Sequence, residues 1–262
     1  MYIRNYEALG QPPEEVIKDF EEQKRRFEMA KALHQQRLAP LPLDILPLQV
    51  LSRAGLRTTT RVGPTTASLI QTALERSRVL RPHIGSKLRR TTVSKEFVIH
   101  SSDEEFNGAY SRLHRIVIPF GSPEEKDLIK KRGFYHFPTR TIHLRPGSNI
   151  GHALHEAIHK YASPAFRGLL GSFLDEGVTQ YFTNLVLQEQ GLDPMMDTYQ
   201  DQLGCANRLV NLFSQGLVAR SYFQGDLGLV HSIVRRLNIN VAGLHPLRKS
   251  NALCQRLASL RP

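Results

Sequence analysis

The chain has 262 residues, 40% of them hydrophobic, and carries a formal net charge of +11. This length and apolar content suffice for one generous domain, or for a compact domain with a smaller helical appendage. No run of eighteen or more apolar residues occurs, and no apolar segment follows residues 1–6. We therefore expect neither a membrane span nor a signal peptide.

The two cysteines, Cys205 and Cys254, are too few for a disulfide framework and show no Cys-x-x-Cys spacing. Nothing in the sequence therefore requires an oxidising compartment. We expect a cytoplasmic protein, or one exported without a cleavable signal peptide. The sequence does not indicate an oligomeric state.

The N-terminal third is predicted to be helical. Pro12-Pro13 followed by two glutamates is typical of a helix start, and apolar residues then recur at helical spacing, which predicts one amphipathic helix over residues 13–38. Prolines mark residues 39–47 as a linker. Residues 48–88 follow a weakly helical pattern of short helices and loops. A change of pattern near residue 92 is our predicted domain boundary.

Much of the positive charge is concentrated in residues 53–95, which hold ten Lys or Arg against the single acid Glu75. Such a stretch can bind nucleic acid, an anionic membrane or an acidic partner. It interleaves no aromatic residues suited to base stacking, so a solvated basic face is the favoured interpretation. Nucleic acid remains a possible partner of this stretch.

Strands are predicted in the middle of the chain. Residues 97–100 and 115–119 are short β-rich runs bounded by Ser, Asp, Gly and Pro, and residues 133–144 end in a third strand. This third strand is expected to border a cleft. An unpaired edge there would bind an extended peptide through main-chain hydrogen bonds, and an ordinary internal strand is the alternative.

The next helix contains His-Glu-x-x-His. Ser148 or Asn149 can cap it, and residues four apart lie on one face of a helix, so His155 and His159 can bind one zinc ion. Glu156 is rotated by about 100° from His155 and can accept a proton from zinc-bound water. His152 is the nearest further imidazole, and we interpret it as a supporting or solvent-facing residue.

A catalytic zinc usually has three protein ligands and one open position. Glu176, early in a second amphipathic helix predicted for residues 172–190, is the expected third ligand, and Asp175 is its competitor. The two helices must pack side by side for the three donors to meet. Further helices are expected from Asp197 and from Ser221 onward.

These motifs resemble the gluzincins, which are zinc peptidases with His-Glu-x-x-His and a glutamate third ligand. Residues 174–182 resemble the Asn/Asp-Glu-Gly-x-x-x-Tyr segment of the aminopeptidase N-like branch, and residues 221–227 are similar to its Tyr-x-x-Gly segment. The resemblance implies that Tyr222 stabilises the oxyanion of the reaction, with Tyr199 or His231 as alternatives. The Gly-x-Met-Glu-Asn segment that anchors a substrate amino terminus in that branch is not visible, so endopeptidase activity is at least as plausible.

The expected fold class is α+β: residues 93–262 form a mainly helical, zincin-like catalytic domain with a small β-sheet above the zinc helix, and residues 1–92 form a helical and linker segment. The expected activity is zinc-dependent hydrolysis of peptide bonds in a peptide or protein substrate. One alternative is a nucleic-acid-associated protein, either a basic binding module or a SprT-like protease. Another alternative is a delivered effector or toxin protease that uses its first 90 residues for docking.

Overall fold

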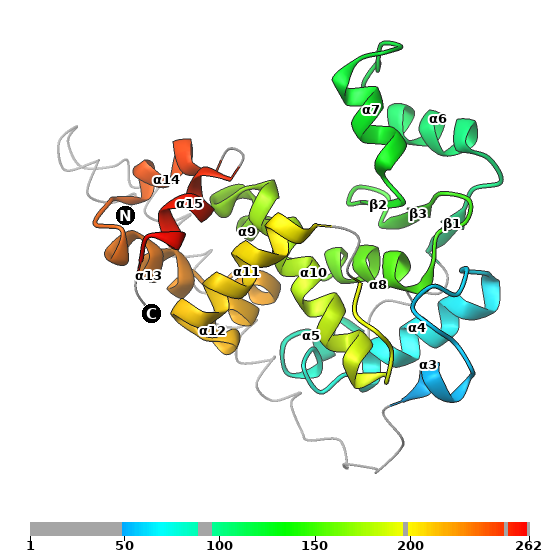
Figure 1. Cartoon of the computed structure of the whole chain (residues 1–262), viewed down its shortest axis with the longest axis horizontal. Helices are drawn as coiled ribbons and strands as arrows, with labels where there is room; N and C mark the ends of the chain where they lie inside the picture. The colour runs from blue at the N-terminus through cyan, green and yellow to red at the C-terminus, as the bar shows by residue number, and fades with distance from the viewer. Residues whose placement is uncertain (1–48, 89–95, 196–198, 249–250, 261–262) are drawn as a thin grey trace, which may run out of the picture. The chain divides into compact units, whose positions relative to one another are not determined.

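The computed structural model describes residues 49–88, 96–195, 199–248 and 251–260. Contacts divide the chain into two compact units, Met1–Leu46 and Pro47–Pro262, and every described residue belongs to the second. The helix predicted for residues 13–38 lies outside the described residues. The described part is mainly helical and contains one three-stranded sheet, so the predicted α+β class is confirmed (Figure 1).

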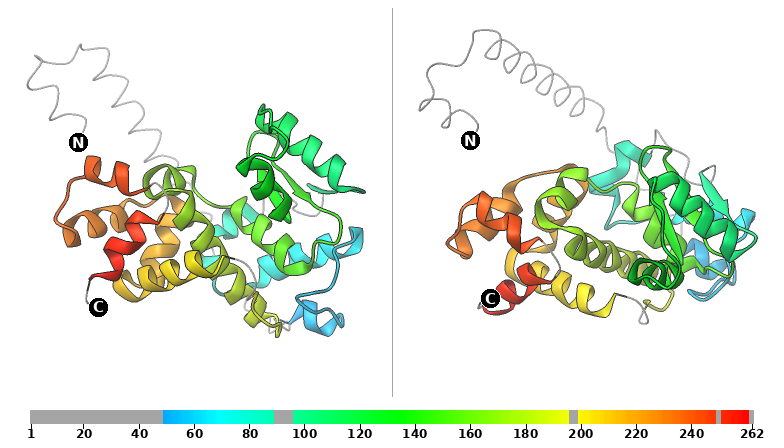
Figure 2. Two further views of the ribbon diagram at one scale, coloured as in Figure 1. Left: turned by 45° about the horizontal axis from the view of Figure 1, so that its top comes forward. Right: turned by 90° about the horizontal axis from the view of Figure 1, so that it is seen from above.

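The sheet has the strand order β1-β3-β2. Strand β3 (Thr141–Leu144) pairs in parallel with β1 (Phe97–Ile99) and antiparallel with β2 (Gly133–His136). The sheet lies between helix α8 and the pair α6 and α7 (Figure 2). The strand predicted at residues 97–100 is confirmed as β1, and the one predicted at the end of residues 133–144 is confirmed as β3. Strand β3 is the central strand of the sheet. Of the two predicted alternatives for this strand, an unpaired edge or an internal strand, the internal strand is therefore confirmed. A sheet edge next to β3 is formed by β2.

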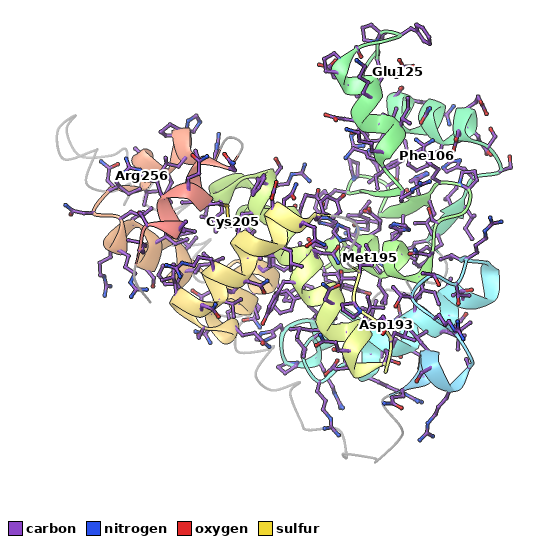
Figure 3. The ribbon with its side chains drawn as sticks, in the orientation of Figure 1. Phe106, Glu125, Asp193, Met195, Cys205 and Arg256 are labelled. Carbon is purple, nitrogen blue, oxygen red and sulfur yellow. A yellow bond between two sulfur atoms is a disulfide. The ribbon has the colours of Figure 1, made fainter. Side chains whose placement is uncertain are left out.

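The strand predicted for residues 115–119 is wrong. These residues follow the end of α6 (Asp103–His114), where Arg115 adopts the left-handed conformation, and they form no ladder. Val117 is 93% exposed, and Ile118 packs, partly buried, against the cluster of Phe106, Leu128 and Phe134 without joining the sheet. Most of the apolar residues that pack on this face of the sheet come from helices, including Phe106 of α6, which Figure 3 labels. Its ring lies edge-on to Phe134 of β2 at 5.4 Å.

Helix α8 (Ile150–His159) begins at a well-defined cap. The Asn149 side chain accepts a hydrogen bond from the His152 backbone N–H at 3.0 Å, and the His152 Nδ1 accepts one from the Asn149 N–H at 3.2 Å. This reciprocal capping satisfies two backbone donors that a helix start leaves unpaired. His152 therefore serves the helix start and is not part of the predicted metal site.

Helix α10 (Ser172–Glu189) confirms the second predicted helix and packs against both α8 and α11 (Gln200–Phe213). Gly177 makes the contact between α10 and α11 possible, because a Cβ at this position would lie 2.1 Å from the backbone oxygen of Gln202 in α11. A side chain there would push α11 away from α10. The glycine of the Asp-Glu-Gly segment thus has a packing role.

The helices that precede the sheet share the same hydrophobic core. Helices α3 (Val50–Arg53), α4 (Pro64–Arg76) and α5 (Arg81–Leu88) confirm the short helices predicted between residues 48 and 88. Their fully buried side chains belong to one cluster with those of α8 and α10. The Lys87 ammonium also donates hydrogen bonds to the Tyr161 and Phe223 carbonyls. The predicted domain boundary near residue 92 stays a prediction.

The remaining helices lie mainly in the C-terminal part. They are α7 (Pro123–Lys130), α9 (Pro164–Leu170), α12 (Gln215–Ala219), the π-helix η2 (Arg220–Gln224), α13 (Gly228–Arg236), α14 (Val241–Leu247) and α15 (Ala252–Ala258). The helix expected near Asp197 begins at Gln200, and the one expected from Ser221 begins with η2 and continues in α13. Among the described helices, none is long and apolar enough to cross a membrane.

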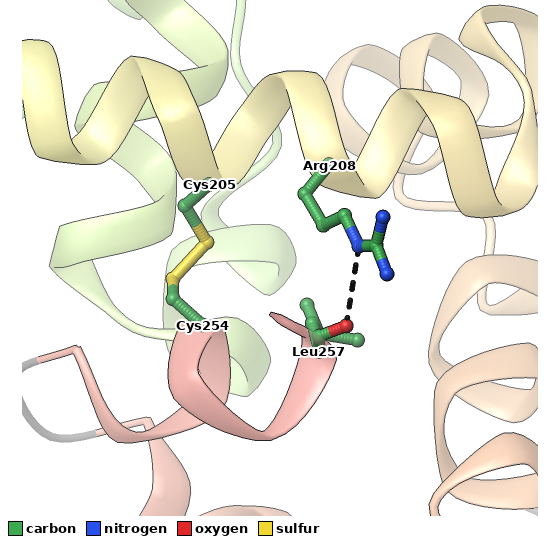
Figure 4. Close-up of a disulfide and its surroundings, with 4 residues drawn as sticks. All are labelled: Cys205, Arg208, Cys254 and Leu257. Carbon is green, nitrogen blue, oxygen red and sulfur yellow. Dashed lines mark hydrogen bonds between the residues drawn. A yellow bond between two sulfur atoms is a disulfide. The ribbon is translucent and has the colours of Figure 1, made fainter. Parts of the chain in front are cut away.

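A disulfide joins Cys205 of α11 to Cys254 of α15, 49 residues apart in the sequence (Figure 4). The Arg208 guanidinium beside it donates a hydrogen bond to the Leu257 carbonyl at 3.4 Å. This pairing was not expected from the sequence, because the two cysteines come together only through the packing of two helices that are distant in the chain. The bond fixes α15 to the helix that packs on α10.

Histidines form a buried network on the α6 side of the sheet. His100 and His143 contact each other through Nε2 and Nδ1 at 3.0 Å, and the Thr141 hydroxyl contacts His143 Nε2 at 2.9 Å. Burial, with His100, His136 and His114 close by, lowers the pKa of His143 to about 4. The native protein therefore keeps this imidazole neutral in mildly acidic solution.

This network predicts a loss of stability in acid. Because the unfolded chain takes up a proton at His143 near pH 6.5 and the native state does so only near pH 4, the free energy of unfolding should fall as pH drops through that window. Urea denaturation with a chelator present, at pH 7, 6, 5 and 4, would measure the fall. The His143→Gln variant should show a shallower fall, and a profile parallel to that of the unmodified protein would contradict the assignment.

Candidate metal centre

Three side chains from two helices converge on one point. The His155 and His159 Nε2 atoms lie 3.2 Å apart, and each lies 3.1 Å from the Glu176 Oε2 atom. The two imidazoles leave α8 one helical turn apart, and the carboxylate leaves the first turns of α10. The structure therefore brings together the three predicted ligands as a group that could hold a metal ion.

The separations among these donors fit a small tetrahedral ion. Zinc binds imidazole nitrogen and carboxylate oxygen at about 2.0–2.1 Å, so two ligand atoms of a tetrahedral site lie about 3.3–3.4 Å apart. The three observed distances of 3.1, 3.1 and 3.2 Å form a nearly equilateral triangle close to that size. The donor set of two imidazoles and one carboxylate also suits zinc.

The orientation of His155 is fixed from behind. Its Nδ1–H donates to the Gln180 Oε1 at 3.1 Å, and the Gln180 amide donates in turn to the Asn184 side chain at 2.8 Å. The Asn184 oxygen also accepts from the Met195 backbone N–H. Because Nδ1 carries the proton, the lone pair of Nε2 points toward the other two donors.

His159 has an equivalent support. Its Nδ1 lies 3.2 Å from the Thr179 hydroxyl and 3.6 Å from the Asp175 carboxylate. The Thr179 hydroxyl donates to the Asp175 backbone carbonyl at 2.7 Å and accepts from the buried Tyr222 hydroxyl at 2.5 Å. Asp175, the predicted competitor of Glu176, thus lies behind His159. Its buried carboxylate also contacts Arg167.

The charges of the centre are strongly coupled. Burial alone would raise the pKa of Glu176, but His159 and His155 outweigh it and hold that pKa well below its usual value. Burial likewise opposes the charged form of His159, yet Glu176 and Asp175 raise its pKa to about 9. The acids and imidazoles therefore stabilise one another, and a cation at their centre would replace the proton of His159.

Glu156 lies beside the three donors. It is 7% exposed, and burial raises its pKa. Gly133 at the start of β2 lies directly over it, since a Cβ on Gly133 would come within 2.8 Å of the Glu156 Cγ. The absence of a side chain at Gly133 thus leaves room for the Glu156 carboxyl to reach the cavity.

The two tyrosines differ in a way that the sequence did not indicate. Tyr222 is fully buried and its hydroxyl is bonded to Thr179, so the structure does not bring it to a cavity. The Tyr199 ring stacks on His155 at 4.8 Å, and its hydroxyl lies close to Glu176. Burial, aided by Glu176 and Glu156, raises the pKa of Tyr199, so its hydroxyl remains a donor. His231 is exposed on α13 and lines neither cavity.

Two cavities meet at Glu156. Lys131, Gly133, Glu156 and Tyr199 line both of them. The first, of about 440 Å³, lies along the end of β2, and we call it the aromatic arm. The second, of about 1020 Å³, lies along the start of β2, and we call it the basic arm. The aromatic arm includes Tyr110, Phe134, Tyr135 and Phe137, and the basic arm includes Arg61, Lys130, Lys131 and Arg132.

Comparison with protein-family models, with curated proteins and with solved structures found no match for this chain. The case for any function therefore depends on the geometry of the site itself.

Sequence reasoning missed several members of this site. Gln180 lies one turn beyond Glu176 on the inner face of α10, and helical spacing from Glu176 could have indicated that it supports an imidazole. Tyr199 was only an alternative, because its position depends on how α11 packs. Gly133 gave no local signal, since its role depends on the approach of β2 to α8.

The centre predicts stoichiometric metal binding. The purified protein, dialysed against zinc and passed through a desalting column, should retain one zinc per chain by elemental analysis. Glu176→Ala should lose most of it, and Gln180→Leu should lower the affinity by about 10- to 100-fold because His155 loses its support. Gln188→Ala, at an exposed position of the same helix, is the matched control. Unchanged zinc content in Glu176→Ala would contradict the ligand set.

Proposed function

We propose that this protein is a zinc-dependent peptidase of gluzincin type. The observation that carries the proposal is the convergence of His155, His159 and Glu176 with a buried carboxyl, Glu156, at the junction of two cavities. A donor set of two imidazoles and one carboxylate leaves a fourth position for water or substrate. Zinc bound there would polarise the scissile carbonyl and lower the pKa of its water ligand toward 7.

Glu156 would act as the general base. It would take a proton from the attacking water and later pass that proton to the leaving amine. Gly133 keeps the space above Glu156 open for the scissile bond.

Tyr199 is the better placed donor for the developing oxyanion. Its hydroxyl is next to Glu176 and lines both cavities, whereas the Tyr222 hydroxyl is turned toward Thr179. A preorganised O–H donor at this point would stabilise charge that appears only in the transition state. Tyr222 would instead act through Thr179 on the orientation of His159.

The substrate would lie along β2. Among the described residues, β2 is a sheet edge, and the two arms extend in both directions from Glu156. An extended peptide could add to this edge through main-chain hydrogen bonds and place residues on both sides of the cleaved bond. This arrangement supports an endopeptidase more than an aminopeptidase.

The other predicted functions have less support in the structure. Within residues 53–88, the arginines lie on three helices whose apolar faces belong to the core and in the turns between those helices, and most of these arginines are exposed, which fits a solvated face. The carboxylate in the triad distinguishes this site from SprT-like proteases, which use a third histidine. The effector hypothesis concerns mainly residues outside the described part and stays a prediction.

The disulfide favours one of the two predicted locations. Disulfides persist mainly in oxidising compartments, so Cys205–Cys254 supports export over the cytoplasm.

Glu156→Gln provides the first test of the activity. The substitution removes the base but none of the three ligands, so zinc content should stay at one per chain while hydrolysis falls by at least about 100-fold. Unfolded casein and a mixed peptide library, with new termini identified by mass spectrometry, would report cleavage. A variant that retains near-normal hydrolysis would refute the proposed base.

The two tyrosines provide the second test. Tyr199→Phe should lower kcat by about 100- to 1,000-fold with zinc content unchanged, because one oxyanion donor is lost. Tyr222→Phe should weaken zinc binding and, at saturating zinc, lower kcat far less. The opposite pattern, with kcat lost only in Tyr222→Phe, would return the oxyanion role to Tyr222.

A further inference from the structure

The basic arm concentrates positive charge within the proposed substrate cleft. Arg61, Lys130, Lys131 and Arg132 line it, and Asp127 and Glu156 are the only acids in its wall within the described part of the chain. Among the described residues, none of these four cations takes part in an ion pair within 4 Å. Charges of one sign that surround a hollow reinforce one another's potential and attract ligands of opposite sign.

These cations are held by a defined backbone framework. The Arg145 backbone N–H donates to the Arg132 carbonyl at 2.9 Å, and the Arg145 side chain donates to the Lys131 carbonyl at 2.8 Å. The Ser148 hydroxyl also donates to the Arg132 carbonyl. On the other wall, Arg61 forms an isolated β-bridge with Asn149, the cap of α8. Two segments about 70 residues apart in the sequence are thus fixed to the turn that starts the zinc helix.

The aromatic arm differs in chemistry. Tyr110, Phe134, Tyr135 and Phe137 line it together with Ala162 and Pro164. Phe137 is 62% exposed and contributes an accessible apolar surface. Among the described residues, Arg61, Lys130 and Arg132 line only the basic arm, whereas the aromatic arm has, among lysines and arginines, only the shared Lys131 and Arg167, which is paired with Asp175.

The direction of a bound peptide follows from β2. Antiparallel pairing is slightly more stable per residue than parallel pairing, and β2 already pairs antiparallel with β3. The basic arm lies at the start of β2 and the aromatic arm at its end. An antiparallel peptide would thus place its carboxyl side over the basic arm.

From this placement we infer that the protein selects peptides with acidic side chains on the carboxyl side of the cleaved bond. The inference rests on the proposed peptidase function. Each exposed ion pair changes affinity by only about 1.5- to 5-fold, so several pairs would act together. The selection should weaken as ionic strength rises, because salt screens exposed charges.

Three peptides test the inference. They share one cleavable segment and carry three Glu on its carboxyl side, three Gln there, or three Glu on its amino side. The kcat/KM of the zinc-loaded protein should be at least about 10-fold higher for the first than for the other two. Fluorescence anisotropy with the Glu156→Gln variant measures the same ranking as affinity, without turnover.

Charge reversal supplies the matched comparison. Lys130→Glu combined with Arg132→Glu should abolish or invert the preference for Glu over Gln. Arg53→Glu combined with Lys126→Glu, at exposed positions that line neither arm, should leave the preference intact. A preference that survives the first pair, or that favours Glu on the amino side, would overturn the inference. So would tighter binding of duplex DNA than of the Glu peptide.

The outcomes separate the two levels of the proposal. Cleavage of all three peptides at equal rates would refute the acidic selection and leave the peptidase function standing. Selective binding of the first peptide by Glu156→Gln, with no cleavage by the unmodified protein, would support the basic arm as a binding site and refute the peptidase function.

Discussion

The packing of α8 against α10 is the constraint on which the site depends. Two imidazoles project from α8 one turn apart, and the Glu176 carboxylate from the neighbouring α10 completes the group of three donors. The fully buried faces of both helices belong to one hydrophobic cluster, so the convergence of the donors is a consequence of core packing. Any change that shifts α10 along α8 by one ångström would separate the Glu176 oxygen from the imidazoles.

Around this contact, the chain uses buried polar groups to aim its ligands. Gln180 orients His155, and Thr179 with Asp175 orients His159, so each imidazole is fixed in the tautomer that presents Nε2. Burying such groups costs free energy unless they are bonded, and here each bonds to another member of the network. Glycines then set the approach of the surrounding elements: Gly177 lets α11 bring Tyr199 close to His155, and Gly133 lets β2 lie over Glu156.

The sequence was sufficient where the information is local. The spacing of His155 and His159, the Asn149 cap and the ends of α10 all follow from helical periodicity and capping, and the structure confirms them. The sequence was insufficient where the structure of a segment, or the role of a residue, depends on packing between elements that are far apart in the chain. Residues 115–119 have strand propensity but no partner strand, and the roles of Tyr199 and Tyr222 depend on which hydroxyl the fold turns toward the cleft. The Cys205–Cys254 bond likewise joins helices whose proximity no local pattern records.

X-ray absorption at the zinc edge tests the central claim most directly. The protein loaded with one equivalent of zinc should show a first shell of nitrogen and oxygen at about 2.0–2.1 Å with the outer-shell signature of two imidazoles, and Glu176→Ala should change that shell. A spectrum with fewer than two imidazoles, with sulfur at about 2.3 Å, or unaltered by the substitution would contradict the account.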